Sequence, residues 1–415
     1  MRLIFTNLNL LDGVNPGKAS VVAIEGKHIV AVMPTIAELG STSGDTIIDL
    51  GGKTLMPGMV SGHFHTTYHN LGAEPGLPLM EHPPAFTAYR GLANVQTALA
   101  CGFTSVVGAG CVYDIDPSLE KAIEAGLVVG PRMVPCSRDM LTSADQTLPW
   151  WTGSPIEQGI NYCDGPVEVT KAVRSEIRRG ARVIGEIFAS GGHGAGVKGC
   201  RNFTREELSA AVAAAHDRGV RVRAHVVGKK FILECIEVGF DILDHCDEMD
   251  EECIEAMVEA GVFVLPSLNL PLMMMKHPMF GFATDQIKAD FDAMCAILPK
   301  AAAAGVKLCV GDDFGAAGMP HGDYANEMAL YVEHAGIAPL EVIKWATRNG
   351  GALTGRGHEL GTIETGKLAD IVVVDGDPST DIRVLCERSR IDLVMRGGRI
   401  VAGARQDEYK RMLAH

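Results

Sequence analysis

The stretch Leu55-Met56-Pro57-Gly58-Met59-Val60-Ser61-Gly62-His63-Phe64-His65 decides the fold prediction. It begins as an apolar run with strand character and ends on two histidines that one residue separates. Side chains two positions apart on a strand point to the same face, so both imidazoles can reach one metal ion. Active sites of (β/α)8 barrels lie at the carboxyl ends of the strands, and this pair stands at such an end. The stretch therefore predicts the first strand of a barrel that ends in metal ligands.

Strand-like and helical patterns alternate over roughly 300 residues after this stretch, which suits a TIM-type barrel with insertions. Eight strand-like runs lie at 55–65, 104–110, 131–137, 182–188, 221–227, 241–246, 261–267 and 306–313. Helical patterns between them include 205–219, 231–239 and 285–305, and several end at a glycine before the next strand. We place a (β/α)8 barrel at residues 57–357 of this α/β chain. An open doubly wound sheet is the rival, but no GxGxxG follows the early strands.

The two ends of the chain have a different sequence pattern, in which short strand-like runs are separated by turns. Strand-like runs occur at 3–5, 20–24 and 28–32, and again at 371–374, 393–395 and 400–401. Two strand-rich ends that flank a different middle predict one small β-sandwich domain. We assign it residues 1–56 and 358–415.

Composition excludes several classes of protein. The chain has 37 Lys and Arg against 51 Asp and Glu, and this net charge of −14 argues against a nucleic-acid partner. No apolar run reaches the roughly 18–20 residues that cross a bilayer, and residues 1–7 resemble a strand and not a signal peptide. The 11 cysteines are scattered without a CxxC pair, which favours buried free thiols. We expect a cytoplasmic homo-oligomer with a small-molecule substrate and no membrane partner.

Four more strand-like runs end on residues that can bind metal. They are Glu186, His225, His245 and Asp313. Each has an ordinary alternative: the histidines suit a hydrogen-bonded core, and the aspartate suits a helix N-cap. A carboxylate inside so apolar a run as 183–188 is costly to bury unless it is paired or bound to metal. Five such strand ends together favour one metal site over five separate structural roles.

The order of these residues resembles that of the amidohydrolase superfamily. The shared order is His-x-His, an acidic ligand on the fourth strand, histidines on the fifth and sixth, and aspartate on the eighth. The resemblance covers nearly the whole chain. It includes TLMPG at 54–58 and GTIETGKLADIVV at 361–373. The stretch ATRNGGA at 346–352 resembles the imidazolonepropionase-like branch of this superfamily.

The fourth strand departs from the commoner pattern. Many two-metal members carry a lysine there, which CO2 carboxylates so that it bridges the ions. No lysine occurs from 172 to 197, and Glu186 occupies the place. A native carboxylate at this position is similar to the enamidases, which hydrolyse cyclic enamides in nicotinate breakdown.

The resemblance implies a binuclear metal-dependent hydrolase of C–N bonds. Two divalent ions per chain are expected, zinc in the first place, with iron or manganese as alternatives. One ion would be held by His63, His65 and Asp313 and the other by His225 and His245, with Glu186 bridging. A hydroxide between the metals would attack the substrate, and Asp313 would act as general acid and base.

The sequence says less about the substrate than about the metal ligands. The residues that we expect to bind it are Tyr68, Arg138, His193 and His321. The enamidase resemblance implies a cyclic amide or enamide that carries a carboxylate, with a non-peptide C–N bond. The second candidate is a dipeptide ending in proline or an N-acyl amino acid. A metal-free scaffold barrel is the alternative from another class, but such relatives usually lose ligands, and all six positions are kept here.

Overall fold

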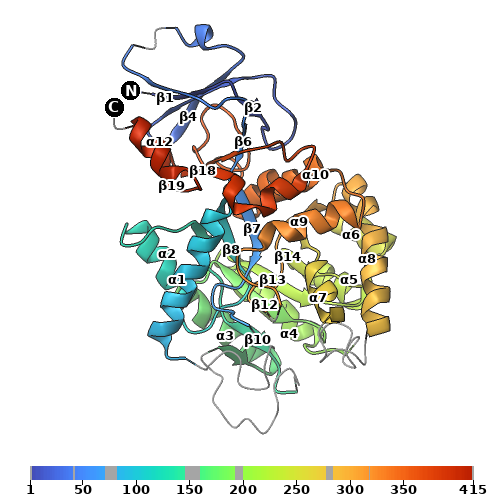
Figure 1. The fold of residues 1–415 in the computed structure, drawn as a ribbon. Coiled ribbons are helices and arrows are strands. Elements are labelled where there is room, and N and C mark those ends of the chain that lie inside the picture. The colour runs from blue at the N-terminus through green and yellow to red at the C-terminus, as the bar shows by residue number, and fades with distance from the viewer. Residues whose placement is uncertain are drawn as a thin grey trace.

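The computed structural model describes residues 2–40, 43–70, 82–144, 159–191, 200–276, 284–316 and 318–413. Parallel strands and helices make up its larger part, and sheets from both ends of the chain make up the rest (Figure 1). None of its helices, within these ranges, combines the length and the apolar character that a membrane span requires.

The parallel strands form two sheets. The smaller one has the order β7 (Met59–Phe64), β8 (Phe103–Gly108) and β9 (Arg132–Val134). The larger one has the order β11 (Ile160–Tyr162), β10 (Asp139–Leu141), β12 (Val183–Phe188), β13 (Arg221–Val226), β14 (Ile242–His245), β15 (Phe263–Leu265) and β16 (Lys307–Leu308). A parallel bridge between Cys136 and Val183 joins them on one side. On the other side the Gly62 N–H donates to the Val310 carbonyl at 2.7 Å.

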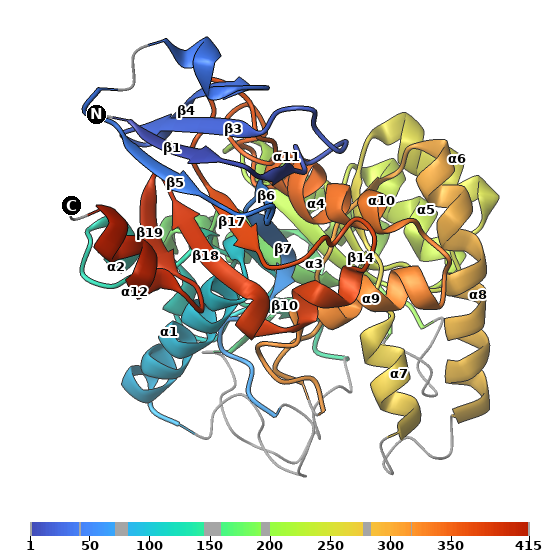
Figure 2. The same ribbon diagram turned by 45° about the horizontal axis from the view of Figure 1, so that its top comes forward.

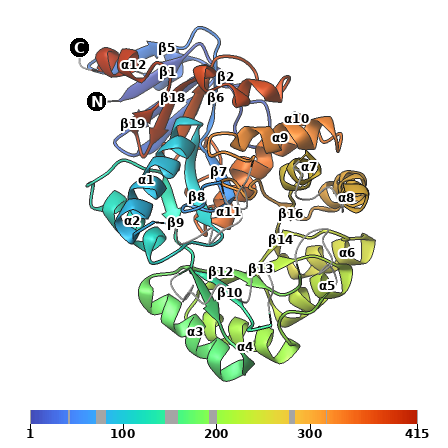
Figure 3. The ribbon, with the colours of Figure 1, turned by 60° about the horizontal axis from the view of Figure 1, so that its bottom comes forward.

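Helices lie outside these strands (Figure 3). In chain order they are α1 (Pro84–Ala100), α2 (Ile115–Glu124), α3 (Gly165–Arg179), α4 (Arg205–His216), α5 (Lys229–Val238), α6 (Glu251–Ala260), α7 (Asn269–Lys276), α8 (Thr284–Ala304), α9 (Tyr324–Glu333), α10 (Pro339–Lys344) and α11 (Gly350–Leu353). Thr204 and Glu207 cap α4 reciprocally, each side chain accepting the other's backbone N–H. Gly180, Gly239 and Gly261 end α3, α5 and α6 in left-handed conformations, which confirms the predicted glycine stops.

Two further sheets are built from the ends of the chain, and the second of them combines both ends. One has the order β4 (His28–Met33), β3 (Val21–Glu25), β1 (Leu3–Thr6) and β5 (Thr46–Asp49). The other has the order β19 (Arg399–Ala402), β18 (Ile391–Arg396), β17 (Ile371–Val374), β6 (Thr54–Pro57) and β2 (Asn9–Leu10). They share one apolar core, to which Phe5, Leu55, Ile371 and Leu393 contribute. Figure 2 shows β17 and β18 beside the N-terminal strands, with α12 (Gln406–Leu413) against them.

The stretch at 55–65, predicted as one strand, is two. β6 pairs antiparallel with β17, whereas β7 pairs parallel with β8. Gly58 separates them, and a Cβ atom there would collide with the Thr104 side chain. The run at 306–313 forms a ladder only at Lys307–Leu308, and β10 and β11 were not predicted.

Candidate metal centre

Four side chains that can bind metal converge at the carboxyl ends of the parallel strands. They are His63, Glu186, His245 and Asp313. One ligand atom of each lies within 4.8 Å of those of the other three. The first three are buried, and Asp313 is 18% exposed. Because they come from β7, β12, β14 and the segment after β16, only the folded chain brings them together.

The histidine nitrogens and the carboxylate oxygens of this group face each other closely. His63 Nε2 lies 2.9 Å from His65 Nε2 and 2.9 Å from Asp313 Oδ1. His65 Nε2 lies 3.1 Å from the same oxygen. Glu186 Oε1 is 3.5 Å from His63 Nε2 and 3.7 Å from His245 Nε2. Glu186 therefore stands between the two histidine clusters that the sequence assigned to separate ions.

His225 lies at the edge of this group. Its ring centroid is 4.7 Å from that of His245, with which it was predicted to share an ion. The opposite neighbour is Phe188, whose ring stacks on the imidazole at 4.5 Å. The structure thus brings His225 beside its predicted co-ligand but outside the tightest set of four.

Asp244 and Ser267, which were not predicted from the sequence, contact the Nδ1 atoms of two of the histidines. His63 Nδ1 lies 3.2 Å from Asp244 Oδ1, and His245 Nδ1 lies 2.9 Å from Ser267 Oγ. With Nδ1 engaged, Nε2 is the atom that faces the centre, as is usual for metal-binding histidines. Burial works against protonation of His63, yet the charges of Asp244 and Glu186 raise its pKa well above the ordinary value. A signal for Asp244 was present in the sequence, since it is a carboxylate in an apolar strand, as Glu186 is.

Asp312 and Asp313 have different partners although they are adjacent. Asp312 Oδ2 accepts the backbone N–H groups of Asn269 and Leu270, both at 3.2 Å, on the side of α7. Asp313 faces the histidines. Burial opposes ionisation of Asp313, but hydrogen bonds with the two histidines of the His-x-His pair outweigh it and hold its pKa well below the usual range.

This set of donors fits divalent metal ions. Imidazole nitrogens and carboxylate oxygens are the ligands that zinc takes in catalytic sites, and iron and manganese take them too. Within the described ranges, no donor makes a hydrogen bond to the buried Glu186 Oε1. Lone pairs gathered in a buried space are costly without a proton or cation between them. Bound ions would remove that cost.

Tyr68 and His321, both predicted to bind substrate, lie near this centre. The Tyr68 ring stacks on His65 with centroids 3.7 Å apart, and its hydroxyl donates to Asp139 Oδ2 at 3.3 Å. His321 Nε2 donates to the Tyr68 carbonyl at 3.2 Å, and Nδ1 lies 2.9 Å from the Tyr324 hydroxyl. Burial lowers the pKa of His321 to about 4, so its imidazole is neutral at pH 7. His321 therefore fixes the segment that carries Tyr68.

Arg138 and His193 were also predicted to bind substrate. The buried guanidinium of Arg138 pairs with Glu176 on α3, with Nη2 2.5 Å from Oε1. A role of Arg138 in substrate binding stays a prediction from the sequence. His193 lies outside the described residues. Asp139, which was not predicted, is buried beside the centre; burial and the charge of Glu186 raise its pKa well above the usual range.

The sequence and the structure of the chain were compared with those of known proteins, and one family matches. The model of the amidohydrolase family matches residues 54–401. An ochratoxinase from Aspergillus niger is 30% identical over 382 residues, which cover 84% of this chain and 76% of that protein. An imidazolonepropionase from Alkaliphilus metalliredigens is 23% identical over 421 residues, covering 92% and 89% of the two chains. The crystal structure of a Xaa-Pro dipeptidase with methionine in its active site superposes with a TM-score of 0.84 at 27% identity, over 97% of this chain and 100% of that one.

Proposed function

The chain belongs to the amidohydrolase family, in its imidazolonepropionase-like branch, and from this premise we propose that it is a binuclear metal-dependent hydrolase of C–N bonds. One observation carries the proposal. Two histidines and two carboxylates from four distant parts of the chain hold their ligand atoms within 4.8 Å in a largely buried space. Such a donor set at the carboxyl ends of parallel strands is typical of a catalytic metal site.

The contacts support a division of the residues between two ions. His63, His65 and Asp313 would hold one ion, and His225 and His245 the other, with Glu186 between them. When bound, the ions supply positive charge that acidifies a water molecule and polarises the scissile carbonyl. Asp244 and Ser267 keep the histidine Nε2 atoms directed at the centre.

Asp313 is the residue placed to move the proton. Its carboxylate is the partly exposed member of the group of four. It can therefore accept a proton from the attacking water and pass it to the leaving nitrogen. Asp312 cannot take this role, because backbone N–H groups hold its carboxylate on the side of α7.

For the substrate, similarity to a Xaa-Pro dipeptidase favours the second class that the sequence suggested. We therefore propose dipeptides and N-acyl amino acids as the first class to test. Cyclic amides or enamides that carry a carboxylate are the second candidate, favoured by Glu186 at the place of the usual lysine. The complete set of ligand-type residues disfavours the alternative of a scaffold without metal.

A hydrolysis screen tests the proposal. Protein supplied with zinc or manganese is assayed for amine or ammonia release from Xaa-Pro dipeptides, N-acyl amino acids and cyclic amides. We expect turnover of at least one class and its loss on Asp313→Asn. Protein that holds two metals but hydrolyses none of these compounds would refute the substrate classes. Protein that binds no metal after supplementation would refute the metal centre and favour the scaffold.

The same proposal includes the closed barrel, the β-sandwich domain, and the cellular location and partners of the protein. The contacts between the two parallel sheets support closure of the barrel, predicted as (β/α)8, over 57–357. The shared core of the end sheets supports a β-sandwich over 1–56 and 358–415. A cytoplasmic homo-oligomer with no nucleic-acid or membrane partner stays a prediction from the sequence.

A further inference from the structure

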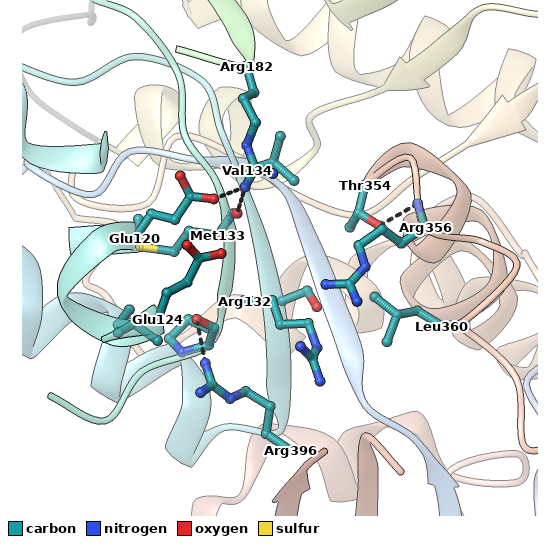
Figure 4. Close-up of a pocket in the computed structure, with 13 residues that line it drawn as sticks. Glu120, Glu124, Arg132, Met133, Val134, Arg182, Thr354, Arg356, Leu360 and Arg396 are labelled. Carbon is teal, nitrogen blue, oxygen red and sulfur yellow. Dashed lines mark hydrogen bonds and ion pairs between the residues drawn. The ribbon is translucent and has the colours of Figure 1, made fainter. Parts of the chain in front are cut away.

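A cavity lies at the amino ends of the parallel strands, on the other side from the metal centre (Figure 4). Arg182 lines this cavity just before β12, and Glu186 belongs to the metal centre four residues further along the same chain segment. At roughly 3.3 Å per strand residue, about 13 Å separate the two positions. The cavity has a volume of about 330 Å³, which is at the lower end of the range for small-molecule sites.

Arginines dominate the charge of this cavity. The four that line it are Arg132, Arg182, Arg356 and Arg396. They come from the start of β9, the residue before β12, the turn after α11 and the end of β18, and Figure 4 shows them around one space. The carboxylates of Glu120 and Glu124 on α2 also line it. Positive groups in the lining therefore outnumber negative ones.

Protein contacts hold two of these guanidinium groups by one edge each. Arg132 donates from Nε and Nη2 to the two oxygens of Asp370, at 2.7 and 2.9 Å. Arg356 donates from Nε to Glu359 at 2.8 Å. An arginine that is already oriented loses less side-chain freedom when it binds a further group. These contacts prepare both residues for a second partner.

The other two arginines are held mainly by carbonyl groups. Arg396 Nη1 donates to the carbonyl oxygens of Gly130 and Pro131, at 2.7 and 3.2 Å. Arg182 Nη2 contacts the Met133 carbonyl at 2.6 Å and also pairs with a glutamate of α2. Within the described part of the chain, Arg396 forms no ion pair with a carboxylate. Its charge is therefore the least compensated of the four.

Repulsion between the arginines adds to this imbalance. Burial, and then the charge of Arg356, lower the pKa of Arg182. Burial and the neighbouring charge of Arg132 lower the pKa of Arg396 in the same way. Like charges held together in partly buried surroundings are unfavourable, and an anion between them relieves the repulsion.

We propose that this cavity is a binding site for a small anion with two or more negative charges, of the organic phosphate or polycarboxylate kind. Planar guanidinium groups that line one space can match the oxygens of such anions in pairs. Because Arg132 belongs to the parallel strands and Arg396 to a sheet of the chain ends, a bound anion joins the two parts of the molecule. The proposal does not depend on the hydrolase activity, since none of the arginines belongs to the metal centre.

Calorimetric titration of the metal-loaded protein with glycerol 3-phosphate and with tricarballylate tests the site. We expect one of them to bind, and Arg396→Gln and Arg356→Gln each to weaken that binding at least tenfold. Glu124→Gln removes a negative charge from the lining and is expected to tighten binding severalfold, which damage to the fold would not do. The matched control is Arg205→Gln, which removes an exposed pair with Glu237 and leaves the affinity unchanged.

Three results would overturn the proposal. The first is no binding of either probe at millimolar concentration. The second is binding that persists at full strength in both arginine variants, which would assign the anion to the metal centre. The third is a Glu124→Gln protein that binds the probe no more tightly than the unaltered protein. Preference for glycerol 3-phosphate would identify the ligand class as organic phosphates, and preference for tricarballylate as polycarboxylates.

Discussion

The two ends of the parallel strands carry opposite surpluses of charge and of hydrogen-bonding groups. At the carboxyl ends, carboxylates and imidazole nitrogens converge on one largely buried space. At the amino ends, four arginines and two glutamates line a cavity, and Asp370 and Glu359 pair with two of these arginines. The carboxyl ends are therefore suited to bind cations, and the amino ends to bind anions. Arg182 and Glu186, which belong to these two proposed sites, are only four residues apart along the chain.

The largest expected effect comes from removing residues 361–415, because the two ends depend on them unequally. The proposed metal ligands all lie before residue 314, whereas the amino end needs Asp370 as the partner of Arg132. The deletion also removes β17, the antiparallel partner of β6. An unpaired apolar strand edge aggregates, so we expect insoluble protein, measured as the soluble fraction after expression. A soluble, active truncated protein would show that the carboxyl end needs nothing from the returning chain.

Asp313→Asn is expected to reduce kcat by about 10³-fold or more while most of the metal stays bound, since an amide oxygen can still bind metal but cannot transfer a proton. Asp312→Asn is the matched control, because its carboxylate accepts backbone N–H groups away from the centre. We expect that variant to stay within about tenfold of the unaltered enzyme. Steady-state kinetics and metal analysis check both. The reverse order of severity would mean that the two neighbouring aspartates have been assigned the wrong way round.

Asp244→Asn tests whether the carboxyl end depends on residues behind the ligands. Asp244 lies 3.2 Å from His63 Nδ1, and loss of such a partner typically weakens metal binding by about 10- to 100-fold. Ser267→Ala provides a parallel variant at His245. Competition with a chelator of known affinity measures the effect. If both variants bind metal as tightly as the unaltered protein, these contacts serve only packing.

The smallest expected effect concerns His321, a neutral group beside the charged centre. Its folded-state pKa of about 4 lies below the ordinary value of 6.5, so the unfolded chain binds the proton more readily. Its contribution to stability is complete above pH 6.5 and is lost as the pH falls toward 4. Linkage sets the loss at roughly 3 kcal/mol at most. His321→Gln is expected to flatten the decline in urea stability of metal-free protein between pH 7 and 4.5.

The control for that experiment is His216→Gln, since His216 is an exposed histidine paired with Asp241. Its variant should keep the full decline. An unchanged slope in His321→Gln would show that other buried groups cause the loss of stability in acid.

Strand ends were the most predictable feature of this molecule. Glu186, His245 and Asp313 could be found from the sequence because each ends or interrupts an apolar run, and a polar group there has few inexpensive roles. The split at Gly58 could not be found, because it depends on which distant strand each half pairs with. The ion pair of Arg138 could not be found for a similar reason. Its buried partner Glu176 lies on a helix 38 residues away, and no local pattern signals that contact.

Glu186 gives the most direct test of the metal centre at the carboxyl end. A glutamate carries its negative charge without CO2, and charge between two dications offsets their repulsion. The decisive measurement is the number of metal ions per chain in the unaltered protein and in Glu186→Gln, each reconstituted with and without bicarbonate. We predict two ions in the unaltered protein under both conditions and fewer than two, weakly held, in the variant. Bicarbonate-dependent loading of the unaltered protein, or a variant that keeps two tightly bound ions, would contradict the account.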